Sequence, residues 1–194
     1  MIDVKIKLEF SPSYTDEEAR TIIRRYTAVI EGNFMAWMGA AALTARSIQG
    51  RYAAEENLWV ELKDDHAGML RAFAQAANAN PGSNDYAAIN DVVSSMRKMV
   101  SEMSGLKNLA LMAVLENTSA TFIPVLEKLA VQLGSTNLVY TKIHGEADVA
   151  HADQFTWALE HEIAHHPEAE KQINEAVALS TDFLKKIFST GVES

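Results

Sequence analysis

Two histidines and an aspartate recur at helical spacing in the second half of the chain, where His144, Asp148 and His151 form an H-x3-D-x2-H pattern. A helix advances about 100° per residue, so offsets of four and seven return all three side chains to one stripe, roughly 10 Å long. Two imidazole nitrogens and one carboxylate oxygen suit iron, manganese or zinc, and they leave positions open for oxygen or a substrate. The alternative is a solvated helix face that happens to carry histidines.

Glu116 is a second candidate ligand, because its helical neighbours are apolar. The residues that share its face are Leu109, Met112, Ala113, Ala120 and Ile123. A buried, unpaired carboxylate is costly, so proteins protonate it, pair it or give it a metal. The alternative is a glutamate that bonds to Asn117, Thr118 or a nearby arginine.

His66 and Glu61 are candidate ligands that can act together only if the helix is interrupted between them. His66 begins an apolar segment, HAGMLRAF, where a lone histidine is more commonly a core or capping residue than a ligand. Glu61 lies five residues earlier, an offset that does not converge on a straight helix. The two side chains can share a metal only if the helix breaks between them, which the polar sequence Lys63-Asp64-Asp65 permits.

A competing motif lies downstream, where His161, Glu162 and His165 match the H-E-x-x-H pattern of zinc hydrolases. In such sites the two histidines bind zinc and the glutamate is the general base. Here Pro167 ends the helix almost at once, and no supporting motif surrounds Glu175, the nearest candidate for a third ligand. The histidines also suit a solvated helix C-terminus.

The elements that carry these residues are predicted to be helices, since only four prolines and nine glycines interrupt 194 residues. The fold class is all-α, with a single domain over 1–194 that comprises an N-terminal arm (1–14) and a bundle of seven or eight helices (15–190). Residues 2–10 alternate in polarity and are expected to form a short strand or an extended arm. The first expected helix begins at a capping box formed by Thr15 and Glu18 and ends at about Gln49, with a break near Gly32-Asn33. The second covers 51–77 and is interrupted at 63–65. The remaining expected helices cover 84–103, 106–133 with a kink or boundary at Pro124, 138–165 and 167–188.

Composition narrows the class of partner. A net charge of -9 and a pI near 5.1 argue against nucleic acid and against an anionic membrane surface. The absence of cysteine excludes disulfides, thiolate ligands and thiol catalysis. No signal peptide and no run of 18 apolar residues is recognised, so a cytoplasmic protein that binds a small molecule is expected, with a homodimer as its assembly.

With these candidates in chain order, the sequence resembles the haem-oxygenase-like diiron oxidases, seven-helix proteins that share the haem oxygenase fold but hold two non-haem irons. The H-x3-D-x2-H triplet is similar to that family's most specific motif. The intervals that separate His66, Glu116 and His144 are also similar to the family's, as is the segment NLWVEL at residues 57–62. The resemblance covers roughly residues 16–190.

The resemblance implies a site for two Fe(II) ions, with O2 as co-substrate. Glu116 would bridge the irons, His66 would bind one, and the triplet would serve the other. Glu61 would be an early carboxylate ligand, a place that Glu55 or Glu56 could take instead. Glu31 would be the extra carboxylate that some members draw from the first core helix. Haem is not expected, because residues 16–50 contain no histidine to serve as its proximal ligand.

The function that the resemblance implies is an O2-dependent oxidase or oxygenase of a small amino-acid-like or fatty-acid-like substrate. The reactions are oxidative C–C cleavage, decarboxylation or N-oxygenation, in natural-product biosynthesis. Candidates for anchoring a substrate carboxylate are Arg24, Arg25, Arg46 and Arg51. Two alternatives stay open: the zinc hydrolase above, and a non-catalytic helical binding protein in which the triplet faces solvent or pairs with arginines.

Overall fold

The computed structural model describes residues 4 and 6–189, and for 146–149 it describes the backbone but not the side chains. Within these residues the chain forms seven α-helices and one 3-10 turn, and no strand. Their bounds are α1 Asp16–Thr44, α2 Ile48–Lys63, α3 His66–Ala76, α4 Ser83–Ser101, α5 Gly105–Gln132, α6 Val139–Glu162, η1 Ile163–His165 and α7 Ala169–Phe188. The all-α fold class predicted from the sequence is confirmed.

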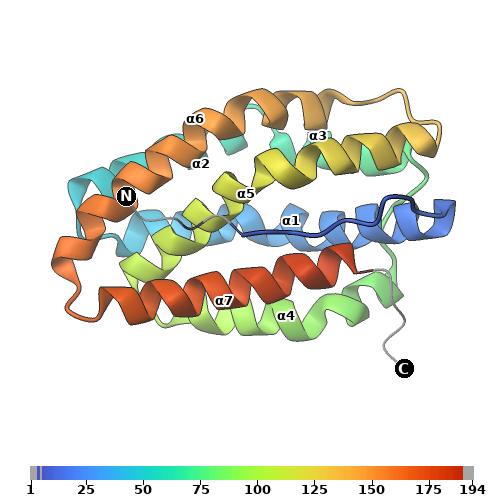
Figure 1. Cartoon of the computed structure of the whole chain (residues 1–194). Helices are drawn as coiled ribbons and strands as arrows, with labels where there is room; N and C mark the ends of the chain where they lie inside the picture. The colour runs from blue at the N-terminus through green and yellow to red at the C-terminus, as the bar shows by residue number, and fades with distance from the viewer. Residues whose placement is uncertain (1–3, 5, 190–194) are drawn as a thin grey trace.

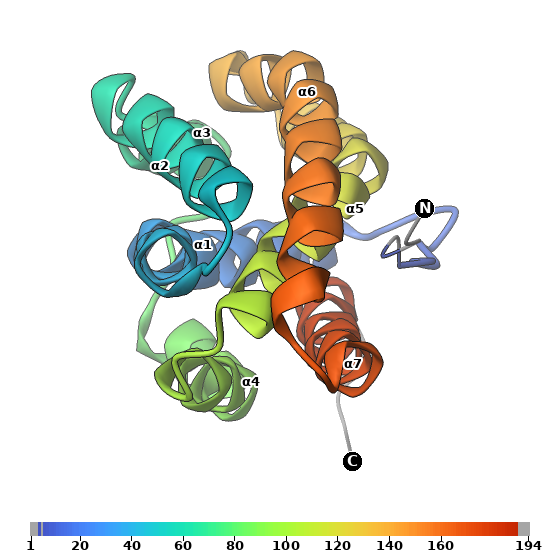
Figure 2. The same cartoon turned by 90° about the vertical axis from the view of Figure 1, so that its left-hand side faces the viewer.

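The helices pack as three layers, which the end-on view separates clearly (Figures 1 and 2). α1 and α5 form the middle layer. The consecutive helices α2 and α3 lie beside α6 on one side of it, and α4 lies beside α7 on the other. The metal-binding candidates therefore come from helices of the middle layer and of the α2/α3/α6 layer.

α5 is the core helix of the bundle. It is long and apolar enough to cross a membrane by length and composition, but 72% of its most apolar stretch is buried inside the protein. That burial is the mark of a core helix packed on all sides by other helices. Pro124 lies inside α5 without ending it, so of the kink or boundary predicted at this proline, the boundary does not occur.

The first helix differs from its prediction at two points. α1 runs unbroken through Gly32 and Asn33, and it ends at Thr44 instead of Gln49. A single glycine costs about 1 kcal/mol of helix stability. The helix absorbs this cost because the predicted capping box is present at Thr15 and because one face of α1 is buried along its length. Ser47 begins α2 directly afterwards, as its N-cap.

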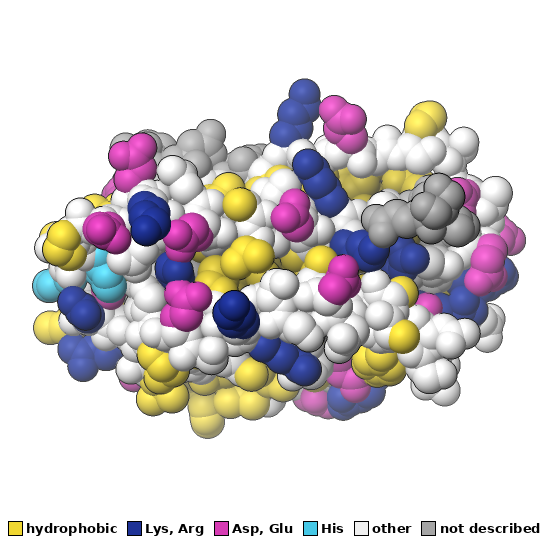
Figure 3. Space-filling view, turned by 90° about the horizontal axis from the view of Figure 1, so that it is seen from below, with side chains coloured by type: hydrophobic (Ala, Val, Ile, Leu, Met, Phe, Trp, Pro, Cys, Tyr) yellow, Lys and Arg dark blue, Asp and Glu magenta, His cyan; other side chains and the backbone are white. Residues whose placement is uncertain are grey.

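The N-terminal residues form an extended arm along the bundle, as the alternation of polarity indicated. Val4, Ile6 and Leu8 are buried, and the backbone N–H of Ile6 donates to Thr118 Oγ1 at 3.4 Å. The ring of Phe10 meets Phe188 of α7 edge-on at 5.3 Å. On the outer face formed by α4 and α7, acidic and basic side chains are interspersed around apolar ones (Figure 3).

Candidate metal centre

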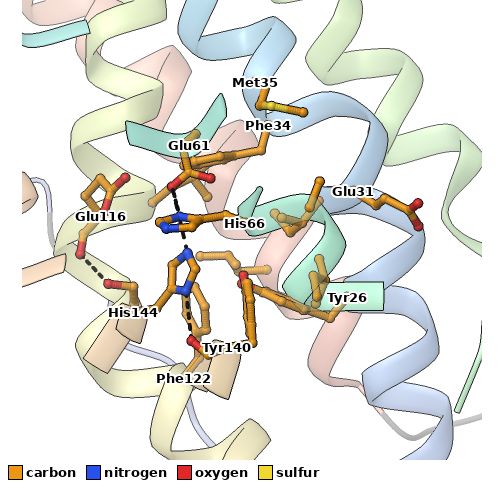
Figure 4. Close-up of a pocket in the computed structure, with 16 residues that line it drawn as sticks. Tyr26, Glu31, Phe34, Met35, Glu61, His66, Glu116, Phe122, Tyr140 and His144 are labelled. Carbon is orange, nitrogen blue, oxygen red and sulfur yellow. Dashed lines mark hydrogen bonds and ion pairs between the residues drawn. The ribbon is translucent and has the colours of Figure 1, made fainter. Parts of the chain in front are cut away.

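Glu61, His66 and His144 lie together in the interior, brought there by three different helices. Glu61 lies near the end of α2, His66 is the first residue of α3, and His144 is in the first half of α6. Nδ1 of His66 is 2.8 Å from Oε1 of Glu61, and Nε2 of His144 is 3.8 Å from the same oxygen (Figure 4). All three residues are more than nine-tenths buried.

The break between α2 and α3 is what lets an offset of five converge. Asp65 adopts the left-handed conformation, with φ of 50°, and its carboxylate caps α3 by accepting the N–H of Gly68 at 3.1 Å. Aspartate is among the few residues that tolerate this backbone conformation. Gly68 allows the close approach, because a Cβ there would lie 2.1 Å from Asp65 Oδ2. The predicted interruption is therefore confirmed, and it turns the His66 side chain toward Glu61.

His144 is oriented by the turn of helix that precedes it. Its Nδ1 lies 2.9 Å from the carbonyl oxygen of Tyr140. A carbonyl oxygen can only accept, so Nδ1–H donates and Nε2 carries the lone pair of the neutral ring. Nε2 is the atom that faces Glu61, and the ring of Tyr140 packs at 4.1 Å against the imidazole. Such fixing of the tautomer by a backbone carbonyl is usual for metal-binding histidines.

The Glu61 carboxylate is an anion in this environment. Burial raises its pKa, but the adjacent imidazoles of His144 and His66 outweigh burial and lower the pKa to about 2. A neutral His144 would present a lone pair to this anion. A proton or a metal cation between the two groups removes that conflict.

The three residues fit a metal ion by their chemistry. Their donor atoms all lie within 4.8 Å of one another, and they make up a two-histidine, one-carboxylate set of the kind that binds non-haem Fe(II). The set borders a cavity of about 40 Å³, enough for a few small species, since one water needs roughly 10–15 Å³. Apolar side chains line the rest, among them Ile30, Phe34, Leu70, Phe122 and Leu184.

A second pair of candidate ligands adjoins the first group. Glu116 is buried, lines the same cavity, and places Oε2 3.8 Å from Nδ1 of His151. His151 lies seven residues after His144 on α6, an offset that returns it to the same face of the helix, as predicted from the spacing of the motif. Asp148 lies on the described backbone of α6, but its side chain is outside the described part of the structure. The structure thus groups His144 with Glu61 and His66, and His151 with Glu116.

The other carboxylates considered from the sequence do not join these groups. Glu55 and Glu56 are exposed on α2, so Glu61 is the early carboxylate that the structure places at the site. Glu31 borders the cavity, but its Oε1 is 2.9 Å from NH1 of Arg71, and its carboxylate points away from Glu61 (Figure 4).

The H-E-x-x-H residues do not form a metal site. Glu162 is fully buried, and its oxygens accept the N–H groups of Arg46 and Ser47, the hydroxyl of Ser47, and Nε2 of His166. The carboxylate oxygens of Glu162 are therefore already hydrogen-bonded, mainly to the residues that connect α1 and α2. His161 and His165 are exposed, and neither belongs to a group of potential ligands among the described residues. The zinc hydrolase alternative lacks the base it needs.

Sequence reasoning missed the residues that hold the ligands in place. Tyr140 orients His144, and its hydroxyl hydrogen-bonds that of buried Tyr26 at 2.7 Å. Asp65 caps the helix that begins with His66. The position of Tyr140, four residues before His144, was a usable signal, because i and i+4 are neighbours on a helix.

Comparison with known proteins identifies the family of the chain. A family model described as an iron-containing redox enzyme matches residues 25–184, which is most of the chain. The match includes every candidate ligand named above. No curated protein and no solved structure gives a significant match.

Proposed function

The chain belongs to the iron-containing redox enzymes of haem oxygenase-like fold, and from this premise we propose that it is an O2-dependent, non-haem diiron oxidase or oxygenase. The observation that carries the proposal is the buried Glu61, His66 and His144 group, with its three donor atoms within 4.8 Å. Ferrous iron bound there would supply the electrons for reduction of O2.

The chain's own residues prepare the first iron position. The break at Asp64-Asp65 presents His66, and the carbonyl of Tyr140 holds the tautomer of His144 that directs Nε2 inward. Glu61 balances part of the cation's charge. Because burial weakens screening, a doubly charged ion is held strongly only where such an anion accompanies it.

Glu116 and His151 are the proposed ligands of a second iron. They approach to 3.8 Å from two helices, α5 and α6, and Glu116 borders the same cavity as the first group. The family resemblance assigns the bridging role to Glu116 and a ligand role to Asp148. If two iron ions occupied these neighbouring positions, the carboxylates would offset their mutual repulsion.

The substrate we propose is a small amino-acid-like or fatty-acid-like molecule, oxidised by C–C cleavage, decarboxylation or N-oxygenation in natural-product biosynthesis. The apolar lining of the cavity supports this class, because it accepts a hydrocarbon portion beside the ligands. The family resemblance supports the reaction types. A cytoplasmic homodimer remains the proposed setting.

Anaerobic titration of Fe(II) into metal-free protein, with and without candidate amino acids and fatty acids, tests the proposal. We expect two irons per chain by colorimetric assay, followed on mixing with O2 by oxygen uptake and a transient absorbance in the visible. Glu116→Ala should lower the stoichiometry and His144→Ala the affinity. A His161→Ala control should behave as wild type. Absence of iron binding under all these conditions, or binding that neither substitution affects, contradicts the proposal.

A further inference from the structure

A second hollow lies against the metal cavity, on the other side of α1. It is a groove between α1, α3 and α4 with a volume of about 400 Å³, within the usual range for small-molecule sites. We call it the outer groove. Its lining consists of Ala28, Glu31, Gly32, Asn33, Met35, Ala67, Arg71, Tyr86, Ile89, Asn90, Val93 and Arg97.

The outer groove and the metal cavity share part of their walls. Glu31, Met35 and Ala67 line both. Met35 and Glu31 come from α1 and lie on the side of the cavity away from His144 (Figure 4). Ala67 follows the ligand His66 directly, and its small side chain takes little space at this junction. A molecule in the outer groove therefore lies one layer of side chains from the ligands.

Arg97 supplies an uncompensated positive charge to the groove. Its Nε and NH2 both donate to Oδ1 of Asn33, at 3.0 and 2.9 Å. Asn33 is buried, and its own amide is fixed by the carbonyl of Val29 at 2.7 Å. The partner that holds the guanidinium is thus rigid but neutral. No carboxylate of a described residue lies within 4.0 Å of Arg97.

The other arginine of the groove is in a different electrostatic state. Arg71 is 2.9 Å from Glu31 and 3.9 Å from Asp65, so its charge is already offset. Arg97 is exposed at the groove, so its guanidinium is accessible to a ligand while Asn33 holds it in place. Guanidinium groups recognise carboxylates through paired, charge-assisted hydrogen bonds.

The groove is bare at Gly32. This residue is exposed, and outside the backbone of its own helix a Cβ added there would have nothing within 4 Å. Tyr86 and Asn90 of α4 add a hydroxyl and an amide to the wall. Among the described residues, the groove therefore combines a guanidinium without an acidic partner, a few polar groups and unfilled space beside Gly32.

We propose that the outer groove is the subsite for the anionic end of the substrate, in which Arg97 binds a carboxylate. The apolar part of the molecule then passes Met35 and Ala67 into the metal cavity. This inference rests on the proposed function, since it takes the inner cavity as the place of oxidation, and among the proposed reactions it favours those that leave the carboxylate in place over decarboxylation. None of the four arginines suggested by the sequence, Arg24, Arg25, Arg46 and Arg51, lines either hollow.

Isothermal calorimetry on metal-free and on Zn(II)-loaded protein tests the proposal. The affinities of hexanoate and octanoate are compared with those of the corresponding neutral amides. We expect the carboxylates to bind wild type at least tenfold more tightly than the amides, because charged hydrogen bonds are the stronger ones. Arg97→Gln should remove that preference. Gly32→Leu, which adds a side chain where a Cβ would have nothing within 4 Å, should weaken the binding of all four ligands at least tenfold.

Arg20→Gln is the control, because it also removes one positive charge, in this case from α1 and not α4, at a position outside both hollows, where the partner is exposed Glu17. It should leave binding unchanged. The proposal is overturned if the carboxylates bind wild type no better than the amides, or do not bind at all. If Arg97→Gln does not fold, the proposal is overturned when Gly32→Leu binds the ligands as tightly as wild type. Since neither protein form contains iron, these results are independent of the iron titration.

Discussion

His144 and His161 occupy equivalent settings on the same helix, yet only one faces a site. Each histidine Nδ1 lies 2.9 Å from the carbonyl four residues earlier, and each ring packs against the aromatic side chain of that residue, Tyr140 or Trp157. The difference is in what Nε2 meets. His144 faces buried Glu61, whereas His161 is exposed. Local helix geometry prepares both rings, and the neighbouring helices decide which can bind a metal.

The two buried glutamates near these histidines differ in the same way. Glu61 meets two imidazoles beside a cavity, and both can exchange a proton for a metal ion. Glu162 meets two backbone N–H groups and a hydroxyl at a helix corner, donors that cannot be replaced by a ligand, and only one imidazole, that of His166. A carboxylate held mainly by fixed donors is structural. One that is surrounded by ring nitrogens is available for metal.

The largest expected difference is in iron affinity. His144→Ala should weaken Fe(II) binding by more than about 100-fold, beyond the 10–100-fold typical of outer-shell partners, because it removes a ligand. His161→Ala loses the equivalent backbone hydrogen bond and should bind iron as wild type does. Anaerobic titration of both variants measures the contrast. Equal losses would show that the helix, and not the cavity, governs binding.

Substitution of Glu162 should affect the stability of the fold and not the affinity for iron. Glu162→Ala leaves the N–H groups of Arg46 and Ser47 without their acceptor, so we expect a loss of about 3 kcal/mol in the free energy of unfolding. Urea denaturation measures it. Glu162→Gln, which keeps one acceptor oxygen, should lose less. Iron affinity should not change in either variant, and a fall in affinity would mean that the two regions are coupled.

Acid should act on the Glu162 region through its depressed pKa. Burial raises the pKa of Glu162, but hydrogen bonds from the backbone of Arg46 and Ser47, the Ser47 hydroxyl and His166 outweigh it and lower the pKa below 4.5. A carboxylate with a lowered folded-state pKa stabilises the protein fully above its unfolded-state pKa, and that contribution is lost as the pH falls through the folded-state value. Unfolding at several pH values below 4.5 should therefore show a steeper loss in wild type than in Glu162→Gln. Parallel profiles would contradict this assignment.

The smallest effect should come from the cap at the α2–α3 break. Asp65→Ala loses the bond to Gly68 N–H and places alanine at φ of 50°, which together should cost about 2 kcal/mol and weaken iron binding severalfold through His66. Asp65→Asn keeps both the cap and the tolerance for this backbone. It should stay near wild type in urea denaturation and in Fe(II) titration. If the two variants lose equal amounts, the charge of Asp65 matters more than its geometry.

Local sequence patterns predicted the helices and their ends well where the signals were strong. The capping box at Thr15 and the polar break at 63–65 are both where they were expected. The break expected at Gly32-Asn33 was wrong, because packing of α1 against its neighbours outweighs the low helix propensity of one glycine. The end of α1 was also misplaced, since the acceptor that satisfies the α1–α2 corner is Glu162, 116 residues from Arg46.

The types of ligand and their helical stripe followed from the sequence, because side chains at offsets of four and seven share a face whatever surrounds the helix. The partition of the ligands did not. His144 joins Glu61 and His66, while His151 joins Glu116, since α6 crosses α2, α3 and α5 at different points along its length. For the same reason, the two motifs alone could not decide whether H-E-x-x-H or H-x3-D-x2-H faces a metal site. Burial and hydrogen-bond partners come from distant segments, and only packing brings those segments together.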